Sequence, residues 1–215
     1  MHYTIVSCSP QNKARSSSSC IAAWVQEVLE NADIYYINDR KKWKICADAI
    51  LQSENVIFVI PLYVEGVPGI MLEFLETLDP EKKKAGTMSF ILQGGFEEAS
   101  QLRTAEKYLK TLPSYFHCEY GGTLLKGGMF GMASMRGKKF KEEMKKCYMA
   151  AMEEYKKKNY FDEKTVKEFA GPEYYSAGMI RLAKLVTPLN RLVWFFMGKR
   201  MGATTSLKSR PYKCN

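Results

Sequence analysis

Serine hydroxyls and basic side chains are concentrated in one short segment near the start of the chain. Residues 8–19 read C-S-P-Q-N-K-A-R-S-S-S-S, and they precede an amphipathic helical pattern. The first amides of a helix point at a ligand and favour negative charge, and serine hydroxyls can surround its oxygens. The segment therefore predicts an anion cradle. The alternative is a serine-rich helix cap that binds nothing.

Two common phosphate-binding motifs are absent from this segment. It contains neither the G-x-G-x-x-G of dinucleotide-binding folds nor the G-K-[ST] of P-loop proteins. Cys8 followed by Arg15-Ser16 resembles the signature of low-molecular-weight tyrosine phosphatases, but six residues separate the cysteine from the arginine where that signature has five. One extra residue in so tight a loop misplaces the thiolate or the guanidinium, so a phosphatase is the weaker hypothesis.

Two further segments combine glycine with aromatic or apolar side chains. Pro61–Pro68 reads P-L-Y-V-E-G-V-P, and Gln93–Glu97 reads Q-G-G-F-E. A planar heterocycle needs a stiff apolar wall, which the first segment offers, and paired glycines let backbone amides approach a ligand edge. Each segment alone is compatible with ordinary turn chemistry. Together they predict the walls of a site for a planar ring.

The elements that must position these segments are short apolar runs alternating with helical patterns. The runs lack strict alternation, as expected for parallel strands buried on both faces. They are Tyr3–Ser7, Ile34–Ile37, Val56–Ile60, Met88–Leu92 and a fifth near Tyr115–Leu125, which Gly121-Gly122 interrupts. This order requires crossover helices and so predicts a doubly wound α/β fold with a five-stranded parallel sheet. Ligands bind such sheets beyond the carboxyl ends of the strands, where all three segments fall.

Composition limits the remaining classes of function. The 215 residues suit one domain with an appendage, and we expect residues 1–160 to form the main domain and residues 161–215 a C-terminal helical extension. The six cysteines include no C-x-x-C pair, so we predict no metal site and a reducing, cytoplasmic location without a signal peptide. The net charge of +9 comes without aromatic-interleaved basic motifs, so no nucleic-acid partner is expected.

The segment Gly178–Arg200 is rich in apolar residues but carries interspersed basic ones and Pro188. It is too charged and too interrupted to span a bilayer. Two interpretations follow. The segment packs on its own domain or on a second subunit, or it lies as an amphipathic helix on anionic lipid.

The three segments, taken in order over residues 3–125, resemble the NAD(P)H-dependent FMN reductase family, and in particular its clostridial-type members. The resemblance implies a flavodoxin-like fold with strand order 2-1-3-4-5, FMN as cofactor and NAD(P)H as co-substrate. It assigns the FMN phosphate to Ser9, Gln11, Ser16, Ser17 and Ser18. It assigns the isoalloxazine ring to Pro61, Leu62, Tyr63, Val64, Gly66, Gln93, Gly94, Gly95 and Phe96. Many relatives carry arginine where this chain has Gln11, so Lys13 or Arg15 is the alternative source of that charge.

The resemblance further implies hydride transfer from nicotinamide to flavin, and then to a small acceptor such as a quinone, a free flavin, or a nitro or azo compound. The flavin carries this chemistry, so no side chain is predicted to be catalytic. Dimerisation is also implied, because members of the broader family commonly pair. The alternatives are an electron-transfer flavodoxin, against which the pI of about 9.1 counts, and a flavin-binding module without turnover.

Overall fold

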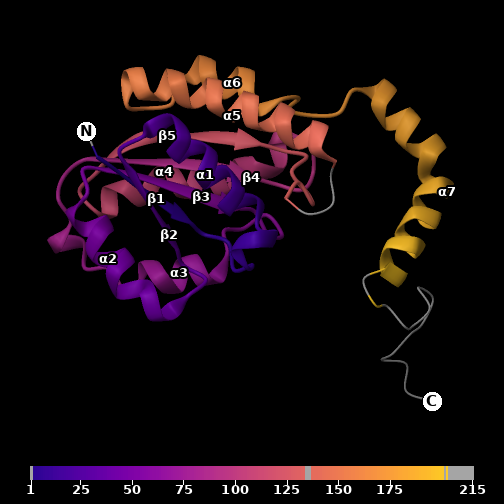
Figure 1. Cartoon of the computed structure of the whole chain (residues 1–215). Helices are drawn as coiled ribbons and strands as arrows, with labels where there is room; N and C mark the ends of the chain where they lie inside the picture. Colours follow the sequence, from indigo (N-terminus) through magenta and orange to yellow (C-terminus); the bar gives the residue numbers. More distant parts are fainter. Residues whose placement is uncertain (1, 134–136, 201, 203–215) are drawn as a thin grey trace. The chain divides into compact units, whose positions relative to one another are not determined.

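The computed structural model describes residues 2–133, 137–200 and 202, and it contains a five-stranded, all-parallel sheet (Figure 1). The strand order is β2-β1-β3-β4-β5, as the resemblance to the FMN reductase family implies. The strands are β1 (Tyr3–Ser7), β2 (Ala32–Tyr36), β3 (Asn55–Pro61), β4 (Thr87–Gln93) and β5 (Glu119–Lys126). The register aligns the last residues of the central strands, because Pro61 pairs with Gln93 and Gln93 with Lys126.

Helices cover both faces of the sheet. They are α1 (Ser17–Leu29), α2 (Trp43–Gln52), α3 (Gly69–Leu75), α4 (Arg103–Tyr115), α5 (Lys138–Lys158) and α6 (Glu163–Ala170). Short 3-10 turns, η1 (Lys13–Arg15), η2 (Arg40–Lys42), η3 (Pro80–Lys82) and η4 (Ala99–Leu102), precede α1, α2, β4 and α4.

The strands separate two cores. One core packs α2, α3 and α4 on one face, with Phe58 stacked on Phe90 at a centroid distance of 5.7 Å. The other packs α1 and α5 on the opposite face, with Trp24 against Tyr148 at 5.9 Å. Strands buried on both faces explain the continuous apolar runs in the sequence.

Strand β5 runs through the glycine pair that interrupts its apolar pattern. An added Cβ on Gly121 would overlap the Ser89 hydroxyl, and one on Gly122 would stand 2.6 Å from the carbonyl oxygen of Phe161. The Ser89 hydroxyl donates to the Gly121 carbonyl at 3.3 Å and lies 2.9 Å from the Tyr155 hydroxyl. The glycines therefore make room for contacts from β4 and from the segment after α5, which explains why the pattern breaks inside a strand.

The chain divides into two compact units, Met1–Tyr174 and Tyr175–Asn215. The first unit extends beyond the predicted range of 1–160, because α6 packs on β5 and α5, with Phe169 and Ala170 buried. In the second unit, the structure describes α7 (Ala177–Arg200) and Gly202, and residue 201 and residues 203–215 lie outside the described part. Among the described residues, no helix has the length and apolarity that crossing a membrane requires.

Replacing Gly122 with alanine should destabilise the protein. Gly122 has φ +88°, which strains any other residue, and its Cβ would meet the Phe161 carbonyl at 2.6 Å. We expect the free energy of unfolding to fall by about 2–4 kcal/mol, measured by urea denaturation. Gly69→Ala is the control, since a Cβ there meets nothing within 4 Å and alanine suits the first turn of α3. Equal stability of the two variants would contradict this account of β5.

Candidate functional site

The serine-rich segment wraps the amino end of α1. Ser16 is the N-cap, and its hydroxyl accepts a hydrogen bond from the Ser19 amide at 3.1 Å. The Ser9 hydroxyl accepts from the Gln11 amide at 3.2 Å. The amides of Ser17 and Ser18 belong to the first turn, which has no intrahelical acceptors. The loop therefore presents helix-start amides beside serine hydroxyls, which is the geometry of an anion cradle.

The five residues predicted to contact a phosphate differ in exposure. Ser9, Ser16 and Ser18 are buried, Ser17 is partly exposed and Gln11 is exposed. The buried hydroxyls accept hydrogen bonds from N–H groups, which leaves their own protons available for donation. The accessible rim of the cradle is thus formed by Gln11 and Ser17, while the buried serines fix the loop beneath it. Contact between any of these residues and a phosphate stays a prediction.

The segment after β3 forms a strained tight turn. Tyr63 and Gly66 exchange both backbone hydrogen bonds, at 2.9 and 3.0 Å. The two residues between them, Val64 and Glu65, have φ +47° and +62°, a conformation that glycine or asparagine normally supplies. A β-branched residue with positive φ is a genuine outlier, and such strain clusters at functional sites. Tyr63 is 41% exposed and Val64 fully exposed, so the turn presents an apolar surface to solvent.

Gln93, at the end of β4, connects all three segments. Its buried side-chain amide donates to the Ser18 hydroxyl at 2.9 Å, which joins β4 to the start of α1. Its carbonyl accepts from the Leu62 amide at 2.7 Å, which joins β4 to the turn after β3. The structure therefore brings together the three segments that the sequence predicts to form one site.

Gly94, Gly95 and Phe96 continue from Gln93 along the same edge of the sheet. Gly94 is buried, and a Cβ there would stand 2.9 Å from Leu102. Gly95 is exposed, and Phe96 is 73% exposed. Pro61 is buried as the last residue of β3, whereas Leu62 and Gly66 are partly exposed. Of the residues predicted to contact a ring, Tyr63, Val64, Gly95 and Phe96 are thus exposed, and contact between any of them and a ring stays a prediction.

A fourth segment, which the sequence analysis did not assign to the site, supports this surface. After β5, the Met129 amide donates to the Gly94 carbonyl at 2.9 Å, and the Gly128 amide donates to the Phe96 carbonyl at 2.8 Å. Gly127 approaches the Phe96 carbonyl so closely that a Cβ would overlap it. The sequence did contain a signal, because Gly127-Gly128 follows the fifth strand as Gly94-Gly95 follows the fourth.

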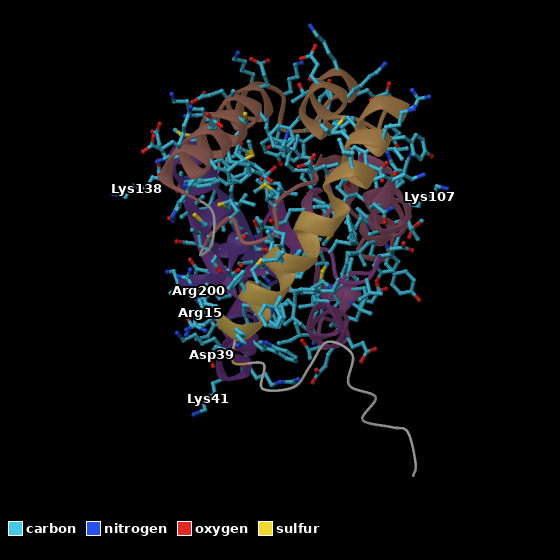
Figure 2. The ribbon with its side chains drawn as sticks, turned by 90° about the vertical axis from the view of Figure 1, so that its right-hand side faces the viewer. Arg15, Asp39, Lys41, Lys107, Lys138 and Arg200 are labelled. Atoms are coloured by element: carbon cyan, nitrogen blue, oxygen red, sulfur yellow. The ribbon has the colours of Figure 1, made fainter. Side chains whose placement is uncertain are left out.

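Two basic residues, Lys13 and Arg15, lie in η1 within the serine-rich segment itself. The Lys13 ammonium lies 4.5 Å from the centre of the Tyr36 ring, and the Asn38 side-chain amide donates to the Gln11 carbonyl at 3.1 Å. Figure 2 shows Arg15 at the same end of the molecule as Asp39 and Lys41. Lys13 and Arg15 are both exposed, so either one is available to supply the positive charge that Gln11 lacks.

Cys8 does not have the surroundings of a nucleophile. Its side chain is completely buried, and its thiol lies 3.6 Å from the Val6 carbonyl oxygen. Burial raises the pKa of the Cys8 thiol well above its usual value, whereas a nucleophilic cysteine needs a lowered pKa and access to substrate. The phosphatase hypothesis therefore loses its nucleophile.

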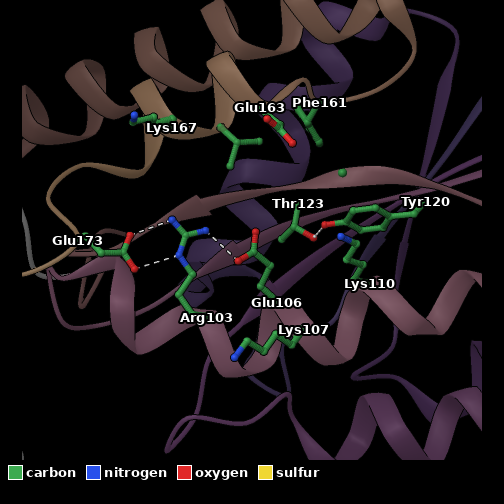
Figure 3. A pocket seen from close by; sticks show the side chains of 12 residues that line it. Arg103, Glu106, Lys107, Lys110, Tyr120, Thr123, Phe161, Glu163, Lys167 and Glu173 are labelled. Atoms are coloured by element: carbon green, nitrogen blue, oxygen red, sulfur yellow. Dashed lines mark hydrogen bonds and ion pairs between the residues drawn. The ribbon is translucent and has the colours of Figure 1, made fainter.

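A cavity of about 490 Å³ lies away from these loops, between α4, β5 and α6 (Figure 3). In its wall, Arg103 forms ion pairs with Glu106 and Glu173, both at 2.8 Å. The Arg103 guanidinium lowers the pKa of the Glu173 carboxyl. Four basic and three acidic side chains line this cavity, and none of the predicted site residues lines it.

Comparisons with known proteins define the fold but not the family. No family model matches the chain, and no curated protein matches its sequence. Solved structures do match. They include an apo NADH:FMN oxidoreductase with 13% identity and TM-score 0.56, which covers 83% of this chain and 98% of that chain. General stress protein 14 from Treponema denticola, in complex with FMN, has 9% identity and TM-score 0.56 over 72% of this chain and 99% of that chain. An NADPH-quinone reductase from P. pentosaceus has 12% identity and TM-score 0.55 over 69% and 96%.

These matches and the strand order identify the first unit as a flavodoxin-like fold. In such folds the carboxyl edge of the sheet, where the serine-rich cradle and the strained turn lie, is the place of ligand binding.

Relieving the strain in the turn after β3 should stabilise the protein. Val64→Asn combined with Glu65→Gly supplies residues that tolerate positive φ at both central positions. We expect the free energy of unfolding to rise by about 1–3 kcal/mol in urea denaturation. The same pair of changes at exposed positions with ordinary backbone, Thr104→Asn and Lys107→Gly in α4, should destabilise instead. A turn variant less stable than the wild type would show that the turn stores no strain.

Cys8 should resist alkylation in the folded protein. At neutral pH, iodoacetamide is expected to modify exposed Cys147, while buried Cys8 and Cys46 stay unmodified until the chain is unfolded. Burial keeps both thiols protonated, and it raises the pKa of Cys46 to about 12. Peptide mass spectrometry in buffer and in guanidinium measures the difference. Rapid modification of Cys8 in buffer, with loss of a phosphatase activity, would restore the phosphatase hypothesis.

Proposed function

We propose that this chain binds FMN across the segments after β1, β3 and β4, and acts as an NAD(P)H-dependent flavin oxidoreductase. The observation that carries the proposal is the junction at Gln93. That residue holds an anion cradle next to an apolar, partly aromatic surface at the carboxyl edge of a flavodoxin-like sheet. FMN combines a phosphate with a planar ring, and it matches both halves of this surface. Neighbours with the same fold include an NADH:FMN oxidoreductase, an FMN complex and an NADPH-quinone reductase.

The residues present fit such a group. The α1 amino end and the hydroxyl of Ser17 offer donors to a phosphate, with Lys13 and Arg15 nearby to offset its charge. Tyr63 and Phe96 present exposed aromatic faces for stacking. Gly95 has room on its exposed side, because a Cβ there would meet only Phe130, at 3.6 Å. The backbone at Gly95 can therefore approach the edge of a ring.

When bound, FMN supplies the redox chemistry between a reduced nicotinamide and a small acceptor such as a quinone, a flavin, or a nitro or azo compound. The chain's own residues have to bind the flavin, orient its ring and shield it from water. The strained turn fixes the position of Tyr63 at the exposed edge of the proposed site. The segment after β5 holds the Phe96 carbonyl through the Gly128 amide. The proposed site contains no histidine and no carboxylate pair, so we assign no acid–base role to any side chain. A cytoplasmic location and assembly as a homodimer complete the proposal.

The experiment that tests the cofactor compares two flavins that differ only in the phosphate group. Purified protein is titrated with FMN and with riboflavin, and the visible flavin absorption bands are followed. We expect FMN to bind more tightly, because only FMN engages the α1 amino end. Addition of NADPH or NADH should then bleach the bound flavin, which separates a reductase from a passive flavin binder.

Ser17→Glu is the informative variant. A carboxylate in the first turn of α1 stabilises the helix but repels a phosphate, so FMN affinity should fall about tenfold or more while riboflavin affinity and stability are kept. Thr104→Glu, in the first turn of α4, is the matched control and should leave both affinities unchanged. Failure of the wild type to bind FMN would contradict the proposed function but not the assignment of the fold. If Ser17→Glu and Thr104→Glu changed the FMN affinity equally, the assignment of the phosphate to the amino end of α1 would be wrong.

A further inference from the structure

A short segment after α6 pairs with η4, the turn that precedes α4, although the two are far apart in the sequence. This segment, residues 171–174, reads G-P-E-Y and is the connector from α6 to the second unit. Its Pro172 carbonyl accepts a hydrogen bond from the Ala99 amide at 3.0 Å, and its Glu173 carbonyl accepts one from the Ser100 amide at 3.2 Å. Both amides belong to the first turn of η4, whose N-cap side chain accepts no hydrogen bond from them. The connector therefore supplies the acceptors that the start of a helix lacks.

Arg103, the first residue of α4, holds the connector through its side chain (Figure 3). Its guanidinium donates to both carboxylate oxygens of Glu173, from Nε at 3.1 Å and from Nη2 at 2.8 Å. Its Nη1 donates to Glu106 at 2.8 Å. The helix dipole disfavours a positive charge at the amino end, and the two carboxylates offset this effect. Exposed ion pairs usually contribute little, but a bidentate pair next to two backbone hydrogen bonds fixes one geometry.

The other end of the connector is held by β5. Lys126, the last residue of β5, donates to the Phe169 carbonyl in the last turn of α6 at 2.9 Å, and its ammonium lies 4.9 Å from the centre of the Phe169 ring. Gly171 then ends α6 with φ +84°, a conformation that suits glycine. Because Phe169 and Ala170 are buried, the connector leaves α6 from a fixed position. It is thus attached at both ends to the first unit.

The turn η4 lies against the segment that is proposed to contact the flavin ring. Leu102, the last residue of η4, is buried, and a Cβ on Gly94 would stand 2.9 Å from its side chain. Contacts therefore lead from the connector through η4 to Gly94, which begins the segment Gly94–Phe96. Neither Arg103 nor Glu173 is among the residues that are predicted to touch the ring.

We propose that Arg103 and Glu173 are positioning residues for the flavin ring. Their pair keeps the connector on η4, and η4 keeps Leu102 against Gly94, so the segment after β4 is held in one orientation. Their role rests on the proposed flavin function, because they determine how tightly that site holds the ring without touching it. Loss of the pair leaves the first amides of η4 without fixed acceptors, so the segment gains freedom that flavin binding must then remove.

Flavin titration of the full-length protein tests this role. Glu173→Ala and Arg103→Ala should each weaken the binding of FMN and of riboflavin by the same factor, roughly fivefold, because the ring and not the phosphate loses its support. At saturating flavin, the visible circular dichroism of the bound ring should differ from that of the wild type. Arg103→Lys keeps the charge but not the bidentate geometry, so it should give values between those of Arg103→Ala and the wild type. The double variant should lose no more affinity than either single variant, because the two residues act together.

Glu27→Ala is the matched control. It removes an ion pair of similar exposure, between Glu27 and Lys145 at 2.6 Å, which joins α1 to α5 on the face of the sheet opposite α4. This variant should leave the affinity for both flavins and the circular dichroism of the bound ring unchanged.

Hydrogen exchange tests the same contacts without flavin. In the flavin-free protein, the amides of Gly94–Leu102 should exchange about tenfold faster in Glu173→Ala than in the wild type, while those of α1 keep their rates. Mass spectrometry of peptic fragments measures both segments. If the wild type bound no flavin, the proposed function would be wrong, and the exchange rates would decide whether the pair holds Gly94–Leu102.

Four results would overturn the proposal. The first is an unchanged flavin affinity in Glu173→Ala and Arg103→Ala. The second is a loss of FMN affinity without a loss of riboflavin affinity, which would place the effect at the phosphate. The third is an equal loss in Glu27→Ala, which would show that removal of any such ion pair weakens flavin binding. The fourth is an unchanged exchange rate of Gly94–Leu102 in Glu173→Ala.

Discussion

The hydrogen bonds of Gln93 are the interactions on which the proposed site depends. The side chain is buried at the end of β4, where its amide donates to Ser18, and the backbone carbonyl of Gln93 accepts from Leu62. A buried amide is costly to leave unpaired, so each of these bonds fixes the loop that supplies the partner. The parallel register makes this possible, because it places Pro61, Gln93 and Lys126 in line at one edge of the sheet. The cradle and the apolar wall are thus held by one residue.

Rigidity around this edge is obtained by close backbone approach and by strain. Gly94 and Gly127 allow neighbouring segments to pack where a Cβ would overlap, and Val64 and Glu65 hold a turn in a conformation that their types disfavour. The surrounding contacts must supply the free energy that keeps such a turn in place. A site that orients a planar ring benefits from this arrangement, because loops that cannot move lose little entropy when a ligand binds. The exposed apolar side chains at the edge then need no rearrangement to form a wall.

The two units of the chain divide the physical tasks between them. The first has charges of both signs, and some of them form ion pairs, such as Lys145 with Glu27 and Lys156 with Glu30, which connect α5 to the carboxyl-terminal end of α1. The second has positive charge only. Exposed ion pairs contribute little to folding, so the charge of the first unit is compatible with a fold that depends on its two apolar cores. The charge of the second unit has no such internal balance.

The architecture of the sheet could be predicted from the sequence. Short apolar runs separated by helical patterns permit only crossover connections, so the parallel sheet, its strand order and the edge that carries the site could be predicted from local patterns and a family resemblance. The exposure of individual residues could not be predicted, because burial depends on neighbours far away in the chain. Ser18 is buried and accepts a hydrogen bond from Gln93, which is distant in sequence, whereas Ser17 beside it is partly exposed. The contribution of Gly127-Gly128 and the burial of Cys8 likewise arise from contacts between distant strands and loops. Those contacts exist only once the sheet has formed.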